Sequence, residues 1–199
     1  MNTETLAPSL VLRPAAPDDA ASLAELINHA GEGLPVYLWT GMAAPGQSPW
    51  DVGRARALRE TGGFSYRNAV VAERDGRTAG TLIGYGIGED PEPVTADMPA
   101  MFVPLQELEN LALGTWYVNV LAVLPGARNL GIGSTLLDRA DEIGRAGGKR
   151  GMSIIVSDAN EGARRLYERH GYRETAKRTM VKDGWENGGR NWVLLAKDL

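Results

Sequence analysis

The hydrophobic positions change their spacing along the chain, and these changes predict strands and helices in alternation. Residues 118–124 form an unbroken apolar run, which is typical of a short buried strand, and residues 152–156 form a second one. Between the two runs, apolar residues recur at helical spacing and predict a helix with one apolar stripe: Ile132, Leu136, Ala140 and Ile143. Because a helix connects them, the two strands are expected to be parallel.

The rest of the chain shows the same two kinds of pattern. Five more segments have strand-like patterns next to turn signals: residues 9–13, 68–73, 78–86, 173–181 and 191–197. An Asp75-Gly76 dipeptide between the second and third of them is a hairpin signal. Three more segments have helical patterns: one from Asp18-Asp19 to Gly31, residues 51–61 and residues 101–113. The aromatic stretch 34–50 and the acidic, proline-containing stretch 89–99 predict no regular element.

Composition narrows the class of protein. The 199 residues are 43% hydrophobic and 23% charged, as in an ordinary globular chain, and we expect one domain over residues 1–199. The net charge of −4 argues against a nucleic-acid-binding surface, which is usually basic. The absence of cysteine excludes disulfides, thiolate metal sites and a cysteine nucleophile. Residues 1–8 lack the pattern of a signal peptide, and no apolar run is long enough for a membrane span, so a cytoplasmic location is the default expectation.

The turn between the first apolar run and its helix is the main chemical feature of the sequence. It reads Arg128-Asn129-Leu130-Gly131-Ile132-Gly133. The two glycines let a ligand approach the backbone closely, and the first amides of the following helix lack intrahelical partners. The helix dipole and Arg128 add positive charge, so the turn is suited to a pyrophosphate.

Two interpretations of this turn come from the residues alone. In a dinucleotide-binding fold, Gly131 and Gly133 would begin a G-x-G-x-x-G pattern, but its last position is Leu136. Asp158 follows the second buried strand, where a ribose-binding acid can lie, yet the chain shows no second mononucleotide-binding half. In the other interpretation, the glycines serve only a tight turn and helix packing.

A third interpretation is a family resemblance. The spacing Arg128-x-x-Gly131-x-Gly133 after an apolar strand resembles the acyl-CoA pyrophosphate loop of the GNAT acetyltransferase superfamily. A second block is similar to that superfamily's pattern N-x-x-A-x-x-L-Y-x-x-x-G-Y: Asn160, Ala163, Leu166, Tyr167, Gly171 and Tyr172. Two blocks in the right order and at the right separation are far more specific than one. The close match covers residues 118–172, and the predicted order β-α-α-β-β-β-α-β-α-β-β agrees with the superfamily over the flanks.

The resemblance implies a fold and a set of cofactor contacts. The fold is α/β, with a mixed, mostly antiparallel sheet, helices on both faces and a splayed pair of parallel strands. Acetyl-CoA is the implied co-substrate, without a metal. Its pantetheine arm is expected to pair with the backbone of the splayed strand at Leu121, Ala122 and Val123. Its pyrophosphate is expected to bind at Arg128, Asn129, Leu130, Gly131, Ile132, Gly133 and Ser134. Three residues on one helix face are expected to meet the same ligand: Asn160, Arg164 and Tyr167.

The resemblance implies a general acid within a motif, but it marks no general base on the central strand. Tyr167 is the expected general acid for the departing thiolate. The central strand, residues 115–124, contains no carboxylate, and its polar Asn119 fits the bulge that this strand usually carries in the superfamily. Glu109, just upstream, is the nominal general base, although a solvated acid on a short helix is an equally good interpretation. A water relayed by Tyr117 or Asn119 is a rival base.

Two features upstream leave alternatives open. The aromatic stretch 34–50 is interpreted either as a loop held by packing or as a substrate lid, because superfamily members shape the acceptor site with this region. Arg54, Arg56 and Arg59 are interpreted as a solvated helix face or, less favourably, as a site for an anionic acceptor.

The resemblance therefore implies N-acetyl transfer from acetyl-CoA to an amine of a small molecule or peptide, by direct attack. A non-catalytic acyl-CoA sensor and a Rossmann-type oxidoreductase are the alternatives. The expected partners are acetyl-CoA and an amine acceptor, with no nucleic acid and no membrane, and a homodimer would be common for such a family.

Overall fold

The computed structural model describes residues 9–199, and these divide into two compact units. Unit 1 holds the described residues up to Ile83 together with Val120–Leu136, and unit 2 holds Gly84–Asn119 and Leu137–Leu199. The single domain expected over residues 1–199 stays a prediction, and the signal-peptide prediction for residues 1–8 lies outside the described residues. Among the helices of residues 9–199, none has the length and apolar character needed to cross a membrane.

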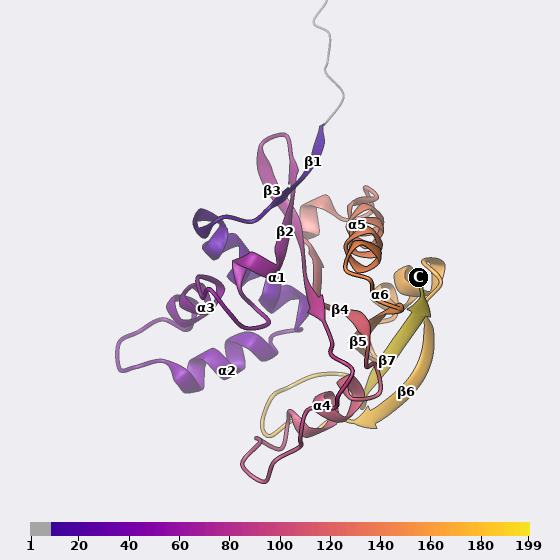
Figure 1. Ribbon diagram of the computed structural model, residues 1–199. Coiled ribbons are helices and arrows are strands. Elements are labelled where there is room, and N and C mark those ends of the chain that lie inside the picture. The colour runs from indigo at the N-terminus through magenta and orange to yellow at the C-terminus, as the bar shows by residue number, and fades with distance from the viewer. Residues whose placement is uncertain (1–8) are drawn as a thin grey trace, which may run out of the picture. The chain divides into compact units, whose positions relative to one another are not determined.

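The described residues form a mixed α/β fold, as predicted (Figure 1). The seven strands are β1 (Leu10–Pro14), β2 (Ala69–Arg74), β3 (Arg77–Gly86), β4 (Thr115–Val123), β5 (Gly151–Ser157), β6 (Arg173–Thr179) and β7 (Asn191–Asp198). The six α-helices are α1 (Ala20–Ala30), α2 (Leu34–Met42), α3 (Pro49–Ala57), α4 (Val103–Glu109), α5 (Ile132–Ala146) and α6 (Glu161–Arg169). The sheet is mostly antiparallel, with β4 and β5 as its parallel pair. The fold class expected from the resemblance is confirmed.

In unit 1, β1, β2 and β3 pair antiparallel in that order. The β2–β3 turn contains the predicted Asp75-Gly76 pair, whose φ angles are 52° and 73°. Such angles suit a tight hairpin turn. A buried cluster joins these strands to helices α1–α3 and to β4, and its largest side chains include Leu23, Leu26, Ile27, Trp39 and Ile83.

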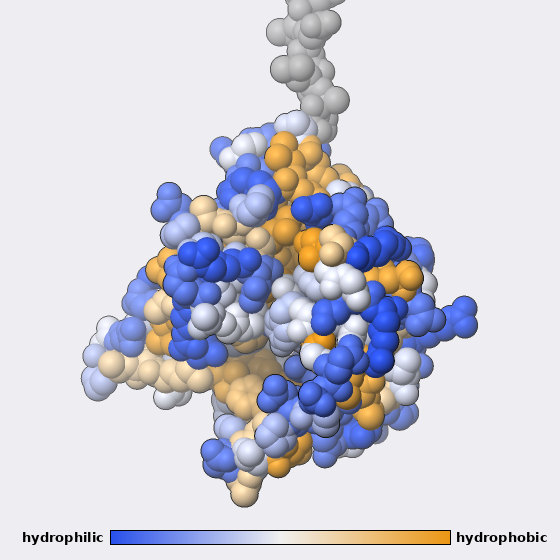
Figure 2. Space-filling model, in the orientation of Figure 1, coloured by the Kyte–Doolittle hydropathy of each residue, from blue (hydrophilic) through white to orange (hydrophobic). Residues whose placement is uncertain are grey.

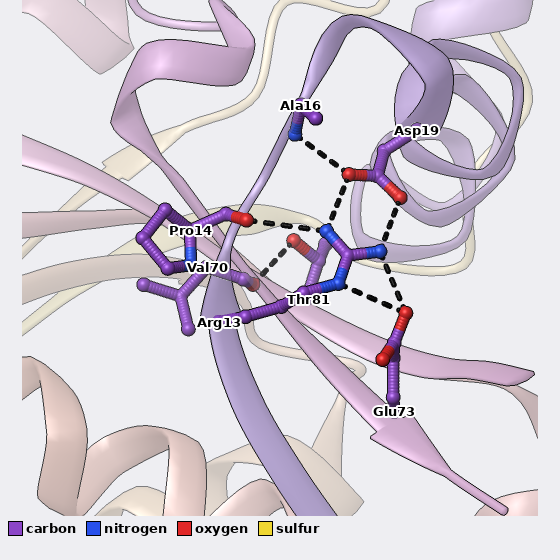
Figure 3. A network of polar contacts seen from close by, with 7 residues as sticks. All are labelled: Arg13, Pro14, Ala16, Asp19, Val70, Glu73 and Thr81. Carbon is purple, nitrogen blue, oxygen red and sulfur yellow. Dashed lines mark hydrogen bonds and ion pairs between the residues drawn. The ribbon is translucent and has the colours of Figure 1, made fainter. Parts of the chain in front are cut away.

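An ion network fixes the start of α1 to the first two strands (Figure 3). The Arg13 guanidinium donates to both carboxylate oxygens of Asp19, at 2.7 and 2.8 Å, and its Nε donates to Glu73 at 2.9 Å. Asp19 also accepts from the Ala16 amide, at 2.7 Å. The hydrogen bond from Arg13 holds the pKa of Asp19 below its ordinary value. The sequence signal at Asp18-Asp19 correctly marked a helix start, but the Asp19 side chain anchors β1 and does not cap α1.

The prediction that residues 34–50 hold no regular element is wrong. Helix α2 begins at Leu34 with Pro35 in its first turn, and α3 begins at Pro49, two residues before the predicted start. Proline is tolerated in a first helical turn because its missing N–H would have no intrahelical partner there. Ser48 caps α3 by accepting from the Trp50 amide at 3.2 Å, and Asp51 accepts from the Ser48 amide at 3.2 Å. The prolines were therefore helix-start signals.

Trp39 is a core residue of unit 1. It is 4% exposed, its ring lies over Gly53, and it meets the Trp50 ring edge-on with centroids 6.0 Å apart. Trp39→Ala is expected to lower the free energy of unfolding by roughly 3–5 kcal/mol, because it leaves a cavity that the helices can fill only partly. Urea denaturation measures this loss. Trp50→Ala is the matched control: Trp50 is 37% exposed and should cost far less, so equal losses would contradict the core role of Trp39.

The three arginines in and after α3 have different surroundings. Where Figure 1 places α3, Figure 2 shows mostly hydrophilic surface. Arg54 is exposed and pairs with Asp51, and Arg59 is exposed, as the solvated-face interpretation requires. Arg56 is half-buried, with its guanidinium 4.0 Å from the sulfur of Met42, and burial followed by the charge of Arg59 lowers its pKa. The solvated-face interpretation therefore fits Arg54 and Arg59 but not Arg56.

In unit 2, the strands lie in the order β4, β5, β7, β6. The closing antiparallel hairpin of β6 and β7, with its long loop, is present as predicted. Helix α4 packs against β5, β6 and β7, where Leu108 and Ala112 bury against Leu194 and Trp192. A salt bridge of 2.6 Å from Arg178 on β6 to Glu107 ties the same helix to the sheet. The predicted helix within residues 101–113 is thus a fixed part of unit 2.

Candidate active site

The predicted phosphate loop connects β4 to α5 and lies in unit 1. After β4 a short 3₁₀ turn, Pro125–Ala127, leads to two residues in the left-handed region, Asn129 at φ 61° and Gly131 at φ 80°. A Cβ at Gly131 would have no atom within 4 Å, so the space beside this glycine is open. Arg128 is exposed, and its Nε donates to the Val123 carbonyl at 3.2 Å. The loop therefore has the open backbone that the sequence predicted.

The start of α5 presents its amides toward this open loop. The first helical hydrogen bond runs from the Thr135 amide to the Gly131 carbonyl, at 3.1 Å. The amides of Ile132, Gly133 and Ser134 precede that bond and have no intrahelical acceptor. Ile132 is 2% exposed and packs beside Gly80 on β3. A Cβ at Gly80 would lie 3.5 Å from the Ile132 side chain and 2.7 Å from the Ala122 carbonyl, so the glycine leaves room for this packing. This packing fixes the first turn of α5, where the helix dipole favours an anion.

The parallel pairing of β4 and β5 ends before either strand does. It covers Thr115–Val118 on β4 and Gly151–Ile154 on β5, whereas β4 continues to Val123 and β5 to Ser157. The parallel pairing thus stops before the part of β4 where the resemblance expects the two strands to splay. Leu121, Ala122 and Val123, the expected pantetheine contacts, belong to the unpaired part of β4 on its β5 side.

The contacts of two glycines on β3 indicate an extra residue in β4. A Cβ at Gly84 would meet the Tyr117 carbonyl at 2.6 Å, and one at Gly80 would meet the Ala122 carbonyl at 2.7 Å. From 117 to 122, β4 advances five residues, while β3 advances four from 80 to 84. One extra residue is the count of a β-bulge, and the interval contains Asn119, the polar residue that fits such a bulge in the sequence.

The second motif block forms α6 and its flanks in unit 2. Asn160 is the N-cap of α6, and its side-chain oxygen accepts from the Ala163 amide at 3.2 Å. Arg164 pairs with Glu174 on β6 at 2.9 Å. Tyr167 is 4% exposed, and its ring lies 6.0 Å from that of Tyr172. Asn160 and Arg164 therefore have structural partners of their own, and their cofactor contacts remain a prediction.

Glu109 ends α4 in a partly buried setting. In contrast to Glu107, its carboxylate has no hydrogen bond or ion pair to any of residues 9–199. Burial raises its pKa from the ordinary 4.5 to about 7. A carboxylate at a helix C-terminus is also unfavourably placed relative to the helix dipole. Glu109 is therefore partly buried rather than fully solvated, and a carboxyl group whose pKa is raised to about 7 is suited to proton transfer.

Two tyrosines lie within electrostatic reach of Glu109. Tyr85 at the end of β3 and Tyr117 on β4 meet edge-on, with ring centroids 5.5 Å apart. Burial, and then the charge of Glu109, raises the pKa of each phenol. The charge of Tyr167 also acts on Tyr117, so Tyr117 lies in range of both the nominal base and the nominal acid. Tyr85 was not predicted from the sequence, because no motif distinguishes a tyrosine near the end of an ordinary hairpin strand.

Asp158 is not available for the ribose contact of a dinucleotide-binding fold. Its carboxylate accepts from the Arg190 and Asn191 amides, at 2.8 and 3.1 Å, and from the Asn191 side chain at 2.9 Å. These bonds hold the loop between β6 and β7. In the described part of the chain, no group of three or more His, Asp or Glu side chains is arranged to hold a metal ion.

The comparisons with known proteins agree with this geometry. A sequence model of the acetyltransferase (GNAT) family matches residues 37–172. A crystal structure of an acetyltransferase is similar at 23% identity and a TM-score of 0.64, covering 94% of this chain and 98% of that one. An N-acetyltransferase from Staphylococcus aureus Mu50 is similar at 17% identity and a TM-score of 0.63, covering 94% and 100%. A GNAT family acetyltransferase from Elizabethkingia anophelis with acetyl-CoA bound is similar at 21% identity and a TM-score of 0.50, covering 66% and 75%. These structures share the fold, and no curated protein sequence matches the chain.

Proposed function

Because the chain belongs to the acetyltransferase (GNAT) family, we propose that it transfers an acetyl group from acetyl-CoA to an amine of a small molecule or peptide by direct attack. The observation that carries this proposal is Glu109, a partly buried and unpaired carboxylate whose pKa is about 7. An amine must lose a proton to attack a thioester, and a base that titrates near the working pH is the most effective one. The acceptor site is assigned to the Glu109 region on this ground.

The residues of the loop fit the diphosphate of CoA. The open side of Gly131 allows close approach, and the amides of Ile132, Gly133 and Ser134 offer donors at a helix N-terminus. Arg128 adds a full positive charge, and we assign Asn129 and Leu130 to the same loop contacts. We assign Leu121, Ala122 and Val123 to backbone contacts with the pantetheine arm. The backbone amide of one of these three residues would also stabilise the oxyanion that forms at the thioester.

The proposed chemistry uses two side chains of unit 2. Glu109 accepts a proton from the acceptor nitrogen, and the freed amine attacks the acetyl carbonyl carbon. Tyr167 then gives its phenolic proton to the sulfur as the carbon–sulfur bond breaks, and solvent restores that proton. Asn160 and Arg164 are assigned to the cofactor side of the same helix, where they are held by their own partners. We also propose that the two units act together as one catalytic domain.

Two measurements on the purified protein test the proposed function together. Calorimetry measures acetyl-CoA binding, and a thiol reagent measures CoA release with a panel of amines. We expect binding together with amine-dependent release and a stoichiometric N-acetylated product. Binding without release for every amine would favour an acyl-CoA sensor, and absence of binding would overturn the proposal.

Gly131→Val is expected to weaken acetyl-CoA binding by at least about tenfold, since loss of one hydrogen bond to a charged group costs roughly 1.5–3 kcal/mol. The valine also meets a φ of 80°, which strains any β-branched residue. Gly76→Val is the matched control, because Gly76 has a φ of 73° and equally open surroundings in the β2–β3 turn. Calorimetry on both folded variants gives the comparison. Unchanged affinity in Gly131→Val, or equal losses in the two variants, would contradict the loop assignment.

A further inference from the structure

Strand β1 is the outer strand of unit 1, and its far edge is exposed. Among residues 9–199, no strand pairs with β1 on the side away from β2. Leu10 is 37% exposed and Val11 is 50% exposed, and where Figure 1 places β1, Figure 2 shows hydrophobic surface. An exposed apolar strand edge is a template for pairing with another strand.

The pairing with β2 determines which backbone groups of β1 face this open edge. The register is continuous from Leu10 to Pro14, and one residue further on the Ala15 amide donates to the Ala69 carbonyl at 2.9 Å. In an antiparallel pair, residues that bond to the neighbouring strand alternate with residues that do not. The odd-numbered residues of β1 therefore bond to β2, and the N–H and C=O groups of Leu10 and Leu12 point away from it.

Strand β6, the outer strand of unit 2, is protected against pairing in a way that β1 is not. Its register against β7 shifts within the strand, and four of its seven residues are charged: Arg173, Glu174, Lys177 and Arg178. Charged side chains and bulges are the usual protection of a strand edge. The one charged residue of β1 is Arg13, which is held by Asp19 and Glu73 (Figure 3). The middle of β1 therefore has no protection of this kind.

We propose that β1 pairs antiparallel with β1 of a second copy of this chain, with Val11 opposite the partner's Val11. In this register Leu10 and the partner's Leu12 exchange two hydrogen bonds, and the two-fold axis repeats the exchange. Every backbone group that Leu10 and Leu12 present at the open edge then has a partner, so the segment is complementary to itself. The register also leaves Pro14, which has no N–H to donate, outside the paired residues.

The contact is short, so the dimer is expected to be weak. Stable interfaces bury about 1,200–2,000 Å², more than one short strand pair supplies, and we expect a dissociation constant of roughly 10–100 µM. Sedimentation velocity of the full chain, at concentrations on both sides of this range, measures the association. A protein that stays monomeric throughout would overturn the proposal, and this is the result expected if another segment of the same chain covers β1.

Opposite charges introduced at one position test the symmetric register. Val11→Lys and Val11→Glu should each weaken self-association by at least about tenfold, because like charges then lie directly opposite across the two strands. An equimolar mixture of the two variants should associate at least about tenfold more tightly than either variant alone, because opposite charges then face each other. Val181→Lys is the matched control, since Val181 is a 42% exposed valine of unit 2, and it should associate as the wild type does. No gain in the mixture, or an equal loss in Val181→Lys, would overturn the proposal.

Amide hydrogen exchange locates the contact without a substitution. The Leu12 amide should exchange at least about tenfold more slowly at a concentration where the dimer predominates than at one where the monomer does. The Arg13 amide is the matched control, because it faces Val71 on β2 and is bonded in both states. Exchange at Leu12 that is independent of concentration, in a sample that dimerises, would place the interface elsewhere and overturn the proposal. None of these residues belongs to the proposed cofactor or acceptor contacts, so failure here leaves the proposed function standing.

Discussion

Replacing Glu109 with glutamine is expected to lower kcat/KM for the acceptor by roughly 100- to 10,000-fold, the usual contribution of a positioned general base. Glutamine keeps the size of the side chain and removes its ability to accept a proton. Acetyl-CoA affinity should change little, because the proposed diphosphate contacts belong to the loop before α5 and to the first turn of that helix. Steady-state kinetics and calorimetry on the same preparation separate the two effects.

The pH dependence gives this prediction a sign. Burial raises the pKa of Glu109 to about 7, and the base must be deprotonated to act, so kcat/KM of the wild type should fall as the pH drops below about 7. The neighbouring phenols of Tyr85 and Tyr117 have pKa values raised above the ordinary value, so they stay protonated through this range. The acidic limb should be absent from the residual activity of Glu109→Gln. An unchanged acidic limb would assign it to another group.

Stability offers an independent test of the same residue. The folded-state pKa of Glu109 is higher than its ordinary value of 4.5, so its ionised form destabilises the fold, and the destabilisation is fully present above pH 7. At about 1.4 kcal/mol per unit, Glu109→Gln should raise the free energy of unfolding by up to about 3 kcal/mol at pH 8. This gain should fade as the pH falls from 7 toward 4.5. Loss of activity together with gain of stability is typical of a substitution in a catalytic site. A lower free energy of unfolding for Glu109→Gln than for the wild type at pH 8 would contradict the burial of the Glu109 carboxylate.

The regular elements of the chain were largely predictable because their signals are local. The apolar runs of β4 and β5 and the stripe of α5 each report burial directly through their period. The prediction failed at α2, where Pro35 and the irregular aromatic stretch were interpreted as breakers. Proline both ends and begins helices, and only its position relative to the cap distinguishes the two.

The candidate site was predictable in its motifs and not in its environment. The glycine positions of the loop were marked by sequence, since Gly131 needs a positive φ that few residues adopt. The setting of Glu109 was not marked, because its burial depends on tertiary packing, which no local sequence signal reports. For Asn160 the motif was visible in the sequence but its structural role was not predicted. The residue, expected to contact a ligand, also serves as the N-cap of its own helix.

Tyr167→Phe is expected to lower kcat by roughly 10- to 1000-fold where proton transfer limits the rate, while acetyl-CoA binding stays almost intact. The reference pKa is about 8.5 for a thiol and about 10 for a tyrosine phenol. A phenol is therefore protonated at neutral pH, yet close enough in acidity to pass its proton to the expelled CoA thiolate. The ring of Tyr167 is held in place by burial and by Tyr172 at 6.0 Å, so phenylalanine should keep its position.

The same motif supplies a matched control for Tyr167. Tyr172 is also buried, but its hydroxyl has no hydrogen-bond partner in the described structure, so Tyr172→Phe keeps the ring and removes a hydroxyl that makes no hydrogen bond. Removing an unsatisfied buried hydroxyl costs nothing in stability and can even increase it. Tyr172→Phe should therefore keep kcat near the wild-type value while Tyr167→Phe loses it. An undiminished kcat in Tyr167→Phe would show that Tyr167 is structural or that water protonates the sulfur, and loss of acetyl-CoA binding would show that its hydroxyl positions the cofactor instead.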